Sequence, residues 1–120
     1  MNKRDKNIEV EDVEFLAANI LERLSCGVLI TDSGGKICYW NKGMERLFGY
    51  SAEEIIGQKA ELLYPDPKKE NFKQDLEKIK SGDTMTGQWL GKNKDGAWIW
   101  VDLNAHLLKD REGVARGIIS

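Results

Sequence analysis

The side chains able to do chemistry are few: the sequence holds one histidine, His106, and two cysteines, Cys26 and Cys38. A structural zinc site needs four ligands of these types, and no CxxC pair is present, so the residues predict neither a zinc site nor a redox motif. Ser25 and Cys26 lack a base to activate them, because His106 lies near the far end of the chain. The residues after His106 also lack the acidic and basic pattern of a kinase phosphoacceptor.

Two further patterns resemble catalytic motifs but have simpler explanations. Gly82 and Gly87 have the spacing of a phosphate-binding loop, but a Gln-Trp pair follows where such a loop requires Lys and then Ser or Thr. Glu53 and Glu54 are better explained as carboxylates at a helix N-terminus, where they oppose the helix dipole. We therefore predict that this chain is not itself an enzyme.

The composition is that of one small domain. The chain has 120 residues, 41% of them hydrophobic and 32% charged, with a net charge of -2 at pH 7. Such a chain can bury one modest core without disulfides. The balanced charge predicts no nucleic acid and no anionic membrane as a partner. The sequence contains no apolar run of about 18 residues and no signal peptide, so we expect no membrane span and a cytoplasmic protein with both cysteines reduced.

The first half of the chain predicts a helix, a hairpin and two short helices. Apolar residues at spacings of three and four make residues 8–24 an amphipathic helix, which covers a sheet or joins a coiled-coil seam. Residues 28–32 and 36–40 predict two strands joined by a turn at Gly34 and Gly35. Asn41 is placed as the N-cap of a short helix that Gly49 ends. A capping box at residues 51–54 begins another helix, which Gly57 ends.

The second half predicts one longer helix and three strands. Residues 60–64 allow a further helical turn, and Asp66 is predicted as the N-cap of a helix that begins at Pro67 and ends at Lys80. From Asp83 the apolar period becomes two, which predicts strands at 84–91, 97–108 and 114–120. The last strand is still apolar at Ser120. We therefore expect a piece of a longer protein, with this strand truncated.

Two segments carry a family resemblance. GVLITDSGGKICYWNKGMERLFGYSAEEIIGQ (residues 27–58) resembles the first half of a PAS domain, and KNKDGAWIWVDLNAHLLKDREGVARGIIS (residues 92–120) resembles its second half. The resemblance implies an α+β PAS fold, in which a five-stranded antiparallel sheet of order 2-1-5-4-3 carries short helices on one face. It divides the chain into an N-terminal flanking amphipathic helix, residues 1–24, and a PAS domain, residues 25–120.

The same resemblance implies a function. PAS domains sense signals and relay them inside multidomain proteins, most often sensor histidine kinases of two-component systems. We therefore expect a sensory or interaction module whose flanking helices carry the state of a ligand or partner to a C-terminal output domain, in a homodimer formed through the N-terminal helix and the outer sheet face. Two alternatives stay open: a flavin- or haem-dependent photosensor or gas sensor, and a dimerisation scaffold that binds no ligand.

The long strand at 97–108 separates the predicted cavity from the predicted docking face. Its odd-numbered residues are apolar and are expected to face the core beneath the helices, while Trp98, Trp100 and His106 face outward. The predicted cavity lining is Leu29, Thr31, Leu62, Leu63, Phe72, Leu76, Trp89, Ile99, Val101 and Leu103. The predicted docking face for the helix or a dimer partner is Val13, Ala17, Ile20, Leu24, Trp98 and Trp100.

We expect no cofactor, although an apolar cavity is compatible with an unidentified small ligand. Trp89 takes up much of the volume that a flavin or haem needs. Flavin-binding light sensors of the family carry a reactive cysteine where this chain has Ala60, and haem-binding members usually carry a histidine on or near the long helix, where residues 67–80 contain none. The simplest interpretation is a filled core or a small ligand.

Overall fold

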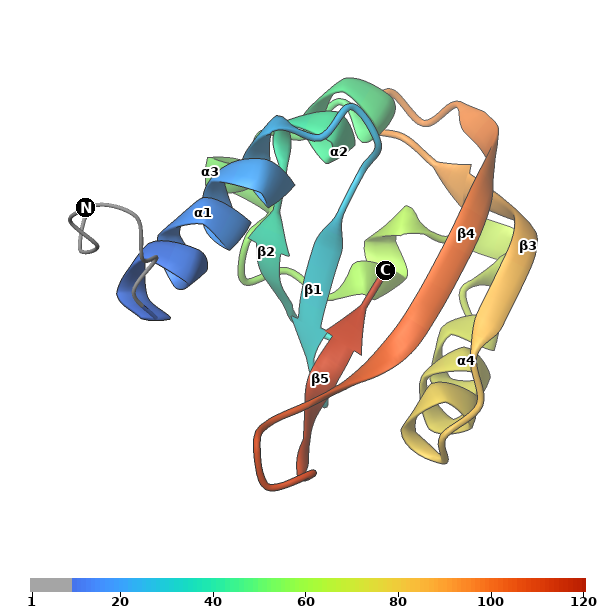
Figure 1. Ribbon diagram of the computed structural model, residues 1–120. Helices are drawn as coiled ribbons and strands as arrows, with labels where there is room; N and C mark the ends of the chain where they lie inside the picture. The colour runs from blue at the N-terminus through green and yellow to red at the C-terminus, as the bar shows by residue number, and fades with distance from the viewer. Residues whose placement is uncertain (1–9) are drawn as a thin grey trace, which may run out of the picture.

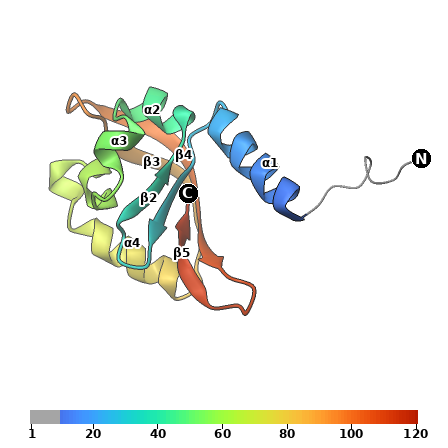
Figure 2. The same cartoon turned by 90° about the vertical axis from the view of Figure 1, so that its left-hand side faces the viewer.

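An antiparallel sheet with helices on one face organises the structure. The computed structural model describes residues 10–120, with side chains from Leu16 onward. The helices α2, α3 and α4 lie on one side of the sheet and α1 lies on the other (Figures 1 and 2). The elements are α1 (Val10–Arg23), β1 (Leu29–Asp32), β2 (Ile37–Trp40), α2 (Lys42–Phe48), α3 (Ala52–Ile55), η2 (Ala60–Leu63), η3 (Asp66–Lys68), α4 (Asn71–Lys80), β3 (Met85–Lys92), β4 (Trp98–Lys109) and β5 (Ala115–Ile119).

The strand order β2-β1-β5-β4-β3 confirms the predicted sheet. The last strand, β5, lies between β1 and β4 and is antiparallel to both, so that Ile119 is paired with Ile30 on one side and with His106 on the other. Gly117 is required at this junction, because a Cβ atom there would collide with the Thr31 carbonyl oxygen. The two ends of the domain are therefore joined at the centre of the sheet.

Burial alternates along β4, as the period of two predicts. Trp98, Trp100 and His106 are exposed, whereas Val101 is half-buried and Ala105 is buried. Because successive side chains of a strand point to opposite faces, this alternation gives the sheet one inner face beneath the helices and one outer face.

The predicted end signals of α2 and α3 are confirmed. Asn41 caps α2 by accepting a hydrogen bond from the Met44 N–H at 3.0 Å, and Gly49 ends the helix with φ of 86°, a conformation that favours glycine. The Ser51 hydroxyl accepts from the Glu54 N–H while the Glu54 carboxylate accepts from the Ser51 N–H, which completes the capping box.

The predicted start of the following helix is wrong. Asp66 begins the short 3₁₀ helix η3 instead of capping it, the N-cap position falls on Pro65, and α4 begins only at Asn71. The Asp66 carboxylate accepts a hydrogen bond at 2.8 Å from Nζ of Lys92 on β3, and this ion pair holds the pKa of Asp66 below its usual range. A cation distant in sequence therefore takes the carboxylate that the local pattern assigns to a helix end.

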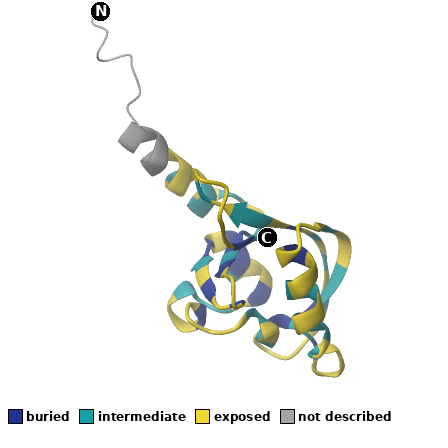
Figure 3. Ribbon diagram, turned by 90° about the horizontal axis from the view of Figure 1, so that it is seen from below, coloured by how far each residue is buried: buried dark blue, intermediate teal, exposed yellow. Residues whose placement is uncertain are grey.

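Helix α1 does not cover the outer face of β4, which corrects the expectation that it docks there within its own domain. It projects away from the sheet (Figures 2 and 3), and Trp98 and Trp100 remain 53% and 67% exposed. On α1, Leu16 and Ile20 are exposed as well. The side chain of Val13, also predicted on this face, lies outside the described residues.

The side chain of Asn41 holds the end of α1, the following linker and α2 together. Its buried Oδ1 accepts hydrogen bonds from the backbone N–H groups of Val28 (2.8 Å) and Met44 (3.0 Å). Its Nδ2 donates to the carbonyl oxygens of Leu21 (2.7 Å) and Cys26 (3.1 Å). These bonds use all four hydrogen-bonding positions of the amide. They place the end of α1 beside α2, which explains why α1 leaves the sheet.

Replacing Asn41 by alanine should lower the free energy of unfolding by about 2–4 kcal/mol, because it removes a helix cap and leaves two buried N–H groups and two partly buried carbonyl groups without their partner. Urea denaturation measures the loss. Asn93→Ala is the matched control, since the Asn93 amide oxygen accepts one hydrogen bond, from the Ala97 N–H in an exposed turn, and should cost about 1 kcal/mol. Equal losses for the two variants would contradict the assigned role of Asn41.

Candidate functional site

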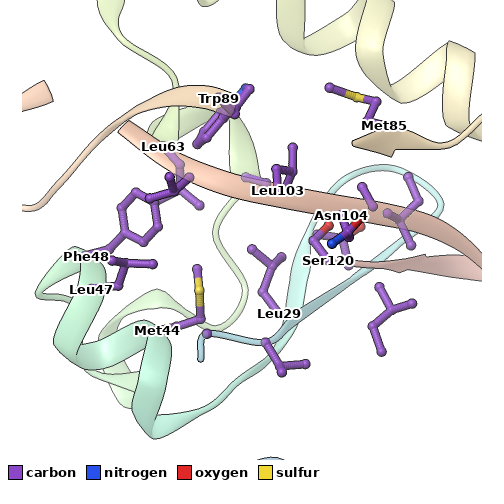
Figure 4. A pocket seen from close by; sticks show the side chains of 18 of the residues that line it. Leu29, Met44, Leu47, Phe48, Leu63, Met85, Trp89, Leu103, Asn104 and Ser120 are labelled. Atoms are coloured by element: carbon purple, nitrogen blue, oxygen red, sulfur yellow. The ribbon is translucent and has the colours of Figure 1, made fainter. Parts of the chain in front are cut away.

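A cavity of about 810 Å³ lies between the sheet and the helices that cover it (Figure 4). Its volume falls in the range typical of small-molecule sites. The cavity also divides the core, because members of two separate buried clusters line it. The larger cluster contributes Leu29, Met44, Phe48 and Leu63, and the smaller one contributes Ile79, Ala105 and Ile118.

The structure brings together eight of the ten residues predicted from sequence to line a cavity: Leu29, Thr31, Leu63, Phe72, Leu76, Trp89, Val101 and Leu103. Contrary to the prediction, Leu62 and Ile99 lie elsewhere, half-buried against the larger core cluster. Adjacent side chains of a 3₁₀ helix point about 120° apart, so Leu63 rather than Leu62 faces inward. Ile99 is paired with Gly91, at the end of β4 that lies beside the Phe48 ring.

Two methionines that the sequence pattern did not single out also line the cavity, Met44 from α2 and Met85 from β3 (Figure 4). The available signal was spacing: Met44 lies one helical turn before the buried Phe48, and Met85 is on the same strand face as Trp89. Methionine side chains are flexible and polarisable, so these two can adjust the shape of the cavity to an occupant.

An aromatic wall bounds the cavity beneath η2 and α4. The Tyr64 ring meets Trp89 edge-on at a centroid distance of 5.1 Å and Phe72 at 5.5 Å. Gly91 makes room for this wall, since a Cβ atom there would lie 2.5 Å from the Trp89 ring. The Trp89 side chain therefore lies against β3 and borders the cavity. The sequence instead predicted that its bulk takes up much of the cavity volume.

A half-buried polar pair, Tyr64 and Asp75, lies in the cavity lining. The Tyr64 hydroxyl donates a hydrogen bond at 2.7 Å to Oδ2 of Asp75 on α4. Burial and then the Asp75 hydrogen bond and charge raise the pKa of Tyr64 well above its usual value. The pair adds to a mostly apolar lining a hydroxyl and a carboxylate that a ligand could address by hydrogen bonding.

The structure places no histidine on α4 for a haem and no cysteine at position 60 for a cysteinyl-flavin adduct. The imidazole of His106 is exposed on the outer face of β4, at the rim of the cavity, and α4 carries no histidine. Ala60 stands on the cavity wall where a reactive cysteine is expected. Of the two free cysteines, Cys38 has its thiol pKa raised by burial and by Asp32. Among the residues described, no three His, Cys, Asp or Glu side chains form a metal-binding group.

The structure is a five-stranded antiparallel sheet of order β2-β1-β5-β4-β3 whose helices cover a mostly apolar cavity on one face. The model of the PAS domain matches residues 25–120, and the chain therefore belongs to the PAS domain family. A PAS domain is a non-enzymatic sensory module, in agreement with the lack of a catalytic constellation in the sequence.

Two solved structures show the same fold. The PAS domain of a protein from Colwellia psychrerythraea is 26% identical and superposes with a TM-score of 0.81, covering 90% of this chain and 92% of its own. A domain of the sensory box sensor histidine kinase/response regulator from Geobacter sulfurreducens is 21% identical, with a TM-score of 0.76 over 92% of this chain and 96% of its own.

Oxygen sensor protein DosP of Escherichia coli (strain K12) is 25% identical over 86 residues. That match covers 68% of this chain and only 11% of the sensor protein. The chain therefore matches only a small part of that relative's length. Within the described part of the chain, no helix is long and apolar enough to cross a membrane.

Tyr64 should ionise at a higher pH than an ordinary tyrosine. A raised pKa in the folded state stabilises the fold below about pH 10, and this contribution is lost as the pH rises further. We expect Tyr64→Phe to leave the phenolate absorbance of the folded protein near pH 10 almost unchanged, and to reduce it only after unfolding in denaturant. In Asp75→Asn, Tyr64 should ionise earlier. Loss of a third of the folded-state signal in Tyr64→Phe would contradict the burial of this hydroxyl.

Proposed function

We propose that this PAS domain senses a small, uncharged and mostly apolar molecule that binds in the cavity beneath the helices. The observation that carries the proposal is the division of the core into two clusters by a cavity of about 810 Å³. A void of this kind costs stability, because its lining side chains lack contact partners. An apolar occupant restores those contacts, and the Tyr64–Asp75 pair offers it one polar anchor.

The donor set supports an organic ligand rather than haem or a covalently bound flavin. Histidine is a common axial ligand of haem iron, and His106 is exposed on the outer face of its strand. The proposal therefore expects the purified protein to show no visible absorbance band. A flavin or haem spectrum would favour the alternative of a cofactor-dependent photosensor or gas sensor.

Asn41 supplies a route from the cavity to the flanking helix. Met44 lines the cavity, and its backbone N–H is bonded to the same amide that holds the Leu21 carbonyl at the end of α1. An occupant that displaces α2 would therefore alter the hydrogen bond between Asn41 and the Leu21 carbonyl oxygen, and with it the position of α1. A ligand can bias such a two-state arrangement only as far as its affinities for the two states differ.

We infer that the domain belongs to a multidomain signalling protein, with a histidine kinase as the leading output. The similarity to a domain of a sensor histidine kinase/response regulator supports this inference, as does the small share of DosP that the chain covers. A cytoplasmic location is part of the proposal and is supported by the two free cysteines. The balanced charge of the chain argues against a nucleic acid partner.

Filling the cavity should abolish ligand binding without unfolding the domain. In Leu103→Trp the larger ring would occupy the cavity, whereas Gln88→Trp adds the same side chain at an exposed position of β3. Indole and 1-octanol serve as probe ligands. At 100 times its Kd, a probe should raise the free energy of unfolding of the wild type and of Gln88→Trp by about 2.7 kcal/mol. The free energy of unfolding of Leu103→Trp should not change. Thermal shift and native mass spectrometry measure this. Equal binding by all three proteins would place the site elsewhere.

The exposed apolar residues on the outer side support a homodimer as the second element of the proposal. Trp98 and Trp100 on β4, with Leu16 and Ile20 on α1, are all more than 40% exposed. Large exposed apolar side chains of this kind are typical of protein–protein contact surfaces. Two copies that pack α1 and the outer sheet face together would cover them.

Trp100→Asp should weaken dimerisation at least tenfold, because it places a charge in the proposed interface. Ile56→Asp is the matched control, since Ile56 is an apolar residue 46% exposed on the helical side of the domain. Sedimentation equilibrium measures both. A monomer–dimer equilibrium unchanged by Trp100→Asp, or altered equally by Ile56→Asp, would count against the outer face as the interface.

A further inference from the structure

Thr31 is a buried polar residue whose hydroxyl has no hydrogen-bonding partner within the described part of the chain. In that part, two polar side chains are buried, Thr31 at 5% exposure and Asn41 at 0%. The Asn41 amide uses all four of its hydrogen-bonding positions, whereas the Thr31 hydroxyl bonds to none of the described residues. A buried hydroxyl without a partner costs free energy, so its retention requires an explanation.

Thr31 lies on the floor of the cavity, at the point where the core is divided. Its side chain lines the cavity on the same face of β1 as Leu29. In the sheet, Thr31 is paired with Ile37 of β2 on one side and with Ile118 of β5 on the other. Ile37 belongs to the larger buried cluster and Ile118 to the smaller one. The hydroxyl is therefore placed between the two clusters, where an occupant of the cavity would lie.

Packing alone does not require a hydroxyl at this position. The paired residues on both sides, Ile37 and Ile118, have apolar side chains that cannot bond to it. Valine has almost the same shape as threonine and prefers strands as strongly, so it would fill the same space without an unpaired polar atom. The hydroxyl of Thr31 is therefore better explained by a partner that enters the cavity.

The charges of the lining indicate what this partner is. The Asp75 carboxylate contributes a negative charge to the cavity wall, while the side chain of Arg46, at the rim, is exposed to solvent. A ligand carboxylate or phosphate would thus enter a space with no buried cation among the described lining residues, at a high desolvation cost. A threonine hydroxyl can donate one hydrogen bond and accept others, so it can bond to a neutral hydroxyl or carbonyl group.

We propose that Thr31 determines the specificity of the cavity by hydrogen-bonding to a neutral hydroxyl or carbonyl group of the ligand. This inference rests on the proposed function and narrows its ligand class to apolar molecules that carry a neutral oxygen group. A hydrocarbon of the same shape would leave the Thr31 hydroxyl shielded from water and unpaired, and the cavity discriminates against it for that reason.

The test compares two probes of nearly the same shape, benzyl alcohol and ethylbenzene, in which a hydroxyl replaces a methyl group. Isothermal titration calorimetry measures the Kd of both probes for the wild type, Thr31→Val and Thr31→Ser. Thr86→Val is the matched control, since Thr86 is exposed on β3. We expect Thr31→Val to reduce the preference for benzyl alcohol over ethylbenzene about tenfold, as loss of one neutral hydrogen bond should. Thr31→Ser and Thr86→Val should keep the wild-type preference.

The failure of this inference is distinguishable from the failure of the proposed function. If the wild type binds the probes and Thr31→Val keeps the same preference, the role of Thr31 is overturned while the cavity remains a binding site. If the wild type binds neither probe, both proposals are overturned.

A second measurement needs no ligand. Thr31→Val without a probe should unfold at the same temperature as the wild type or at a higher one, because the hydroxyl that it removes has no partner. A lower unfolding temperature would show that the hydroxyl is already satisfied in the empty domain, and would overturn the inference.

Discussion

The buried amide of Asn41 is the interaction on which the arrangement of this domain depends. One side chain satisfies backbone groups from the end of α1, the linker before β1, and the first turn of α2. Only an amide can do so, because the site requires two donors and an acceptor of two hydrogen bonds on one short side chain. Aspartate would replace both donors with a buried charge. The direction of the flanking helix and the position of the cavity wall are thus set by the same residue.

The sequence predicted those features whose causes are local. The cap that Asn41 places on the Met44 N–H, the helix end at Gly49 and the capping box at Ser51 involve groups within a few residues, and the two-residue period of β4 follows from strand geometry alone. The start of the long helix could not be predicted, because Lys92 approaches Asp66 only once β3 is in place. The amphipathic stripe of α1 likewise predicted a covered face but not what covers it.

Most members of the candidate site were predictable from the sequence, but Met44, Met85 and the volume of the cavity were not. The alternation of side chains along β4 and the apolar face of α4 identify the residues that face inward. Whether these side chains contact one another or leave a cavity between them depends on long-range packing. Phe72 illustrates this: its ring approaches Gly35 in the β1–β2 turn so closely that a Cβ atom there would collide with it. A contact between residues this far apart fixes the start of α4 against the β1–β2 turn, and no local pattern predicts it.

The distribution of tryptophans gives the domain a built-in optical readout. Trp40 is buried in the larger cluster, Trp89 borders the cavity against Tyr64, and Trp98 and Trp100 are exposed to solvent. Emission from water-exposed indoles lies to the red of emission from buried ones, so the two populations report on different events. The blue component follows changes inside the cavity through Trp89, and the red component follows coverage of the outer face. Fluorescence of the unlabelled protein can therefore separate changes in the cavity from changes at the outer face.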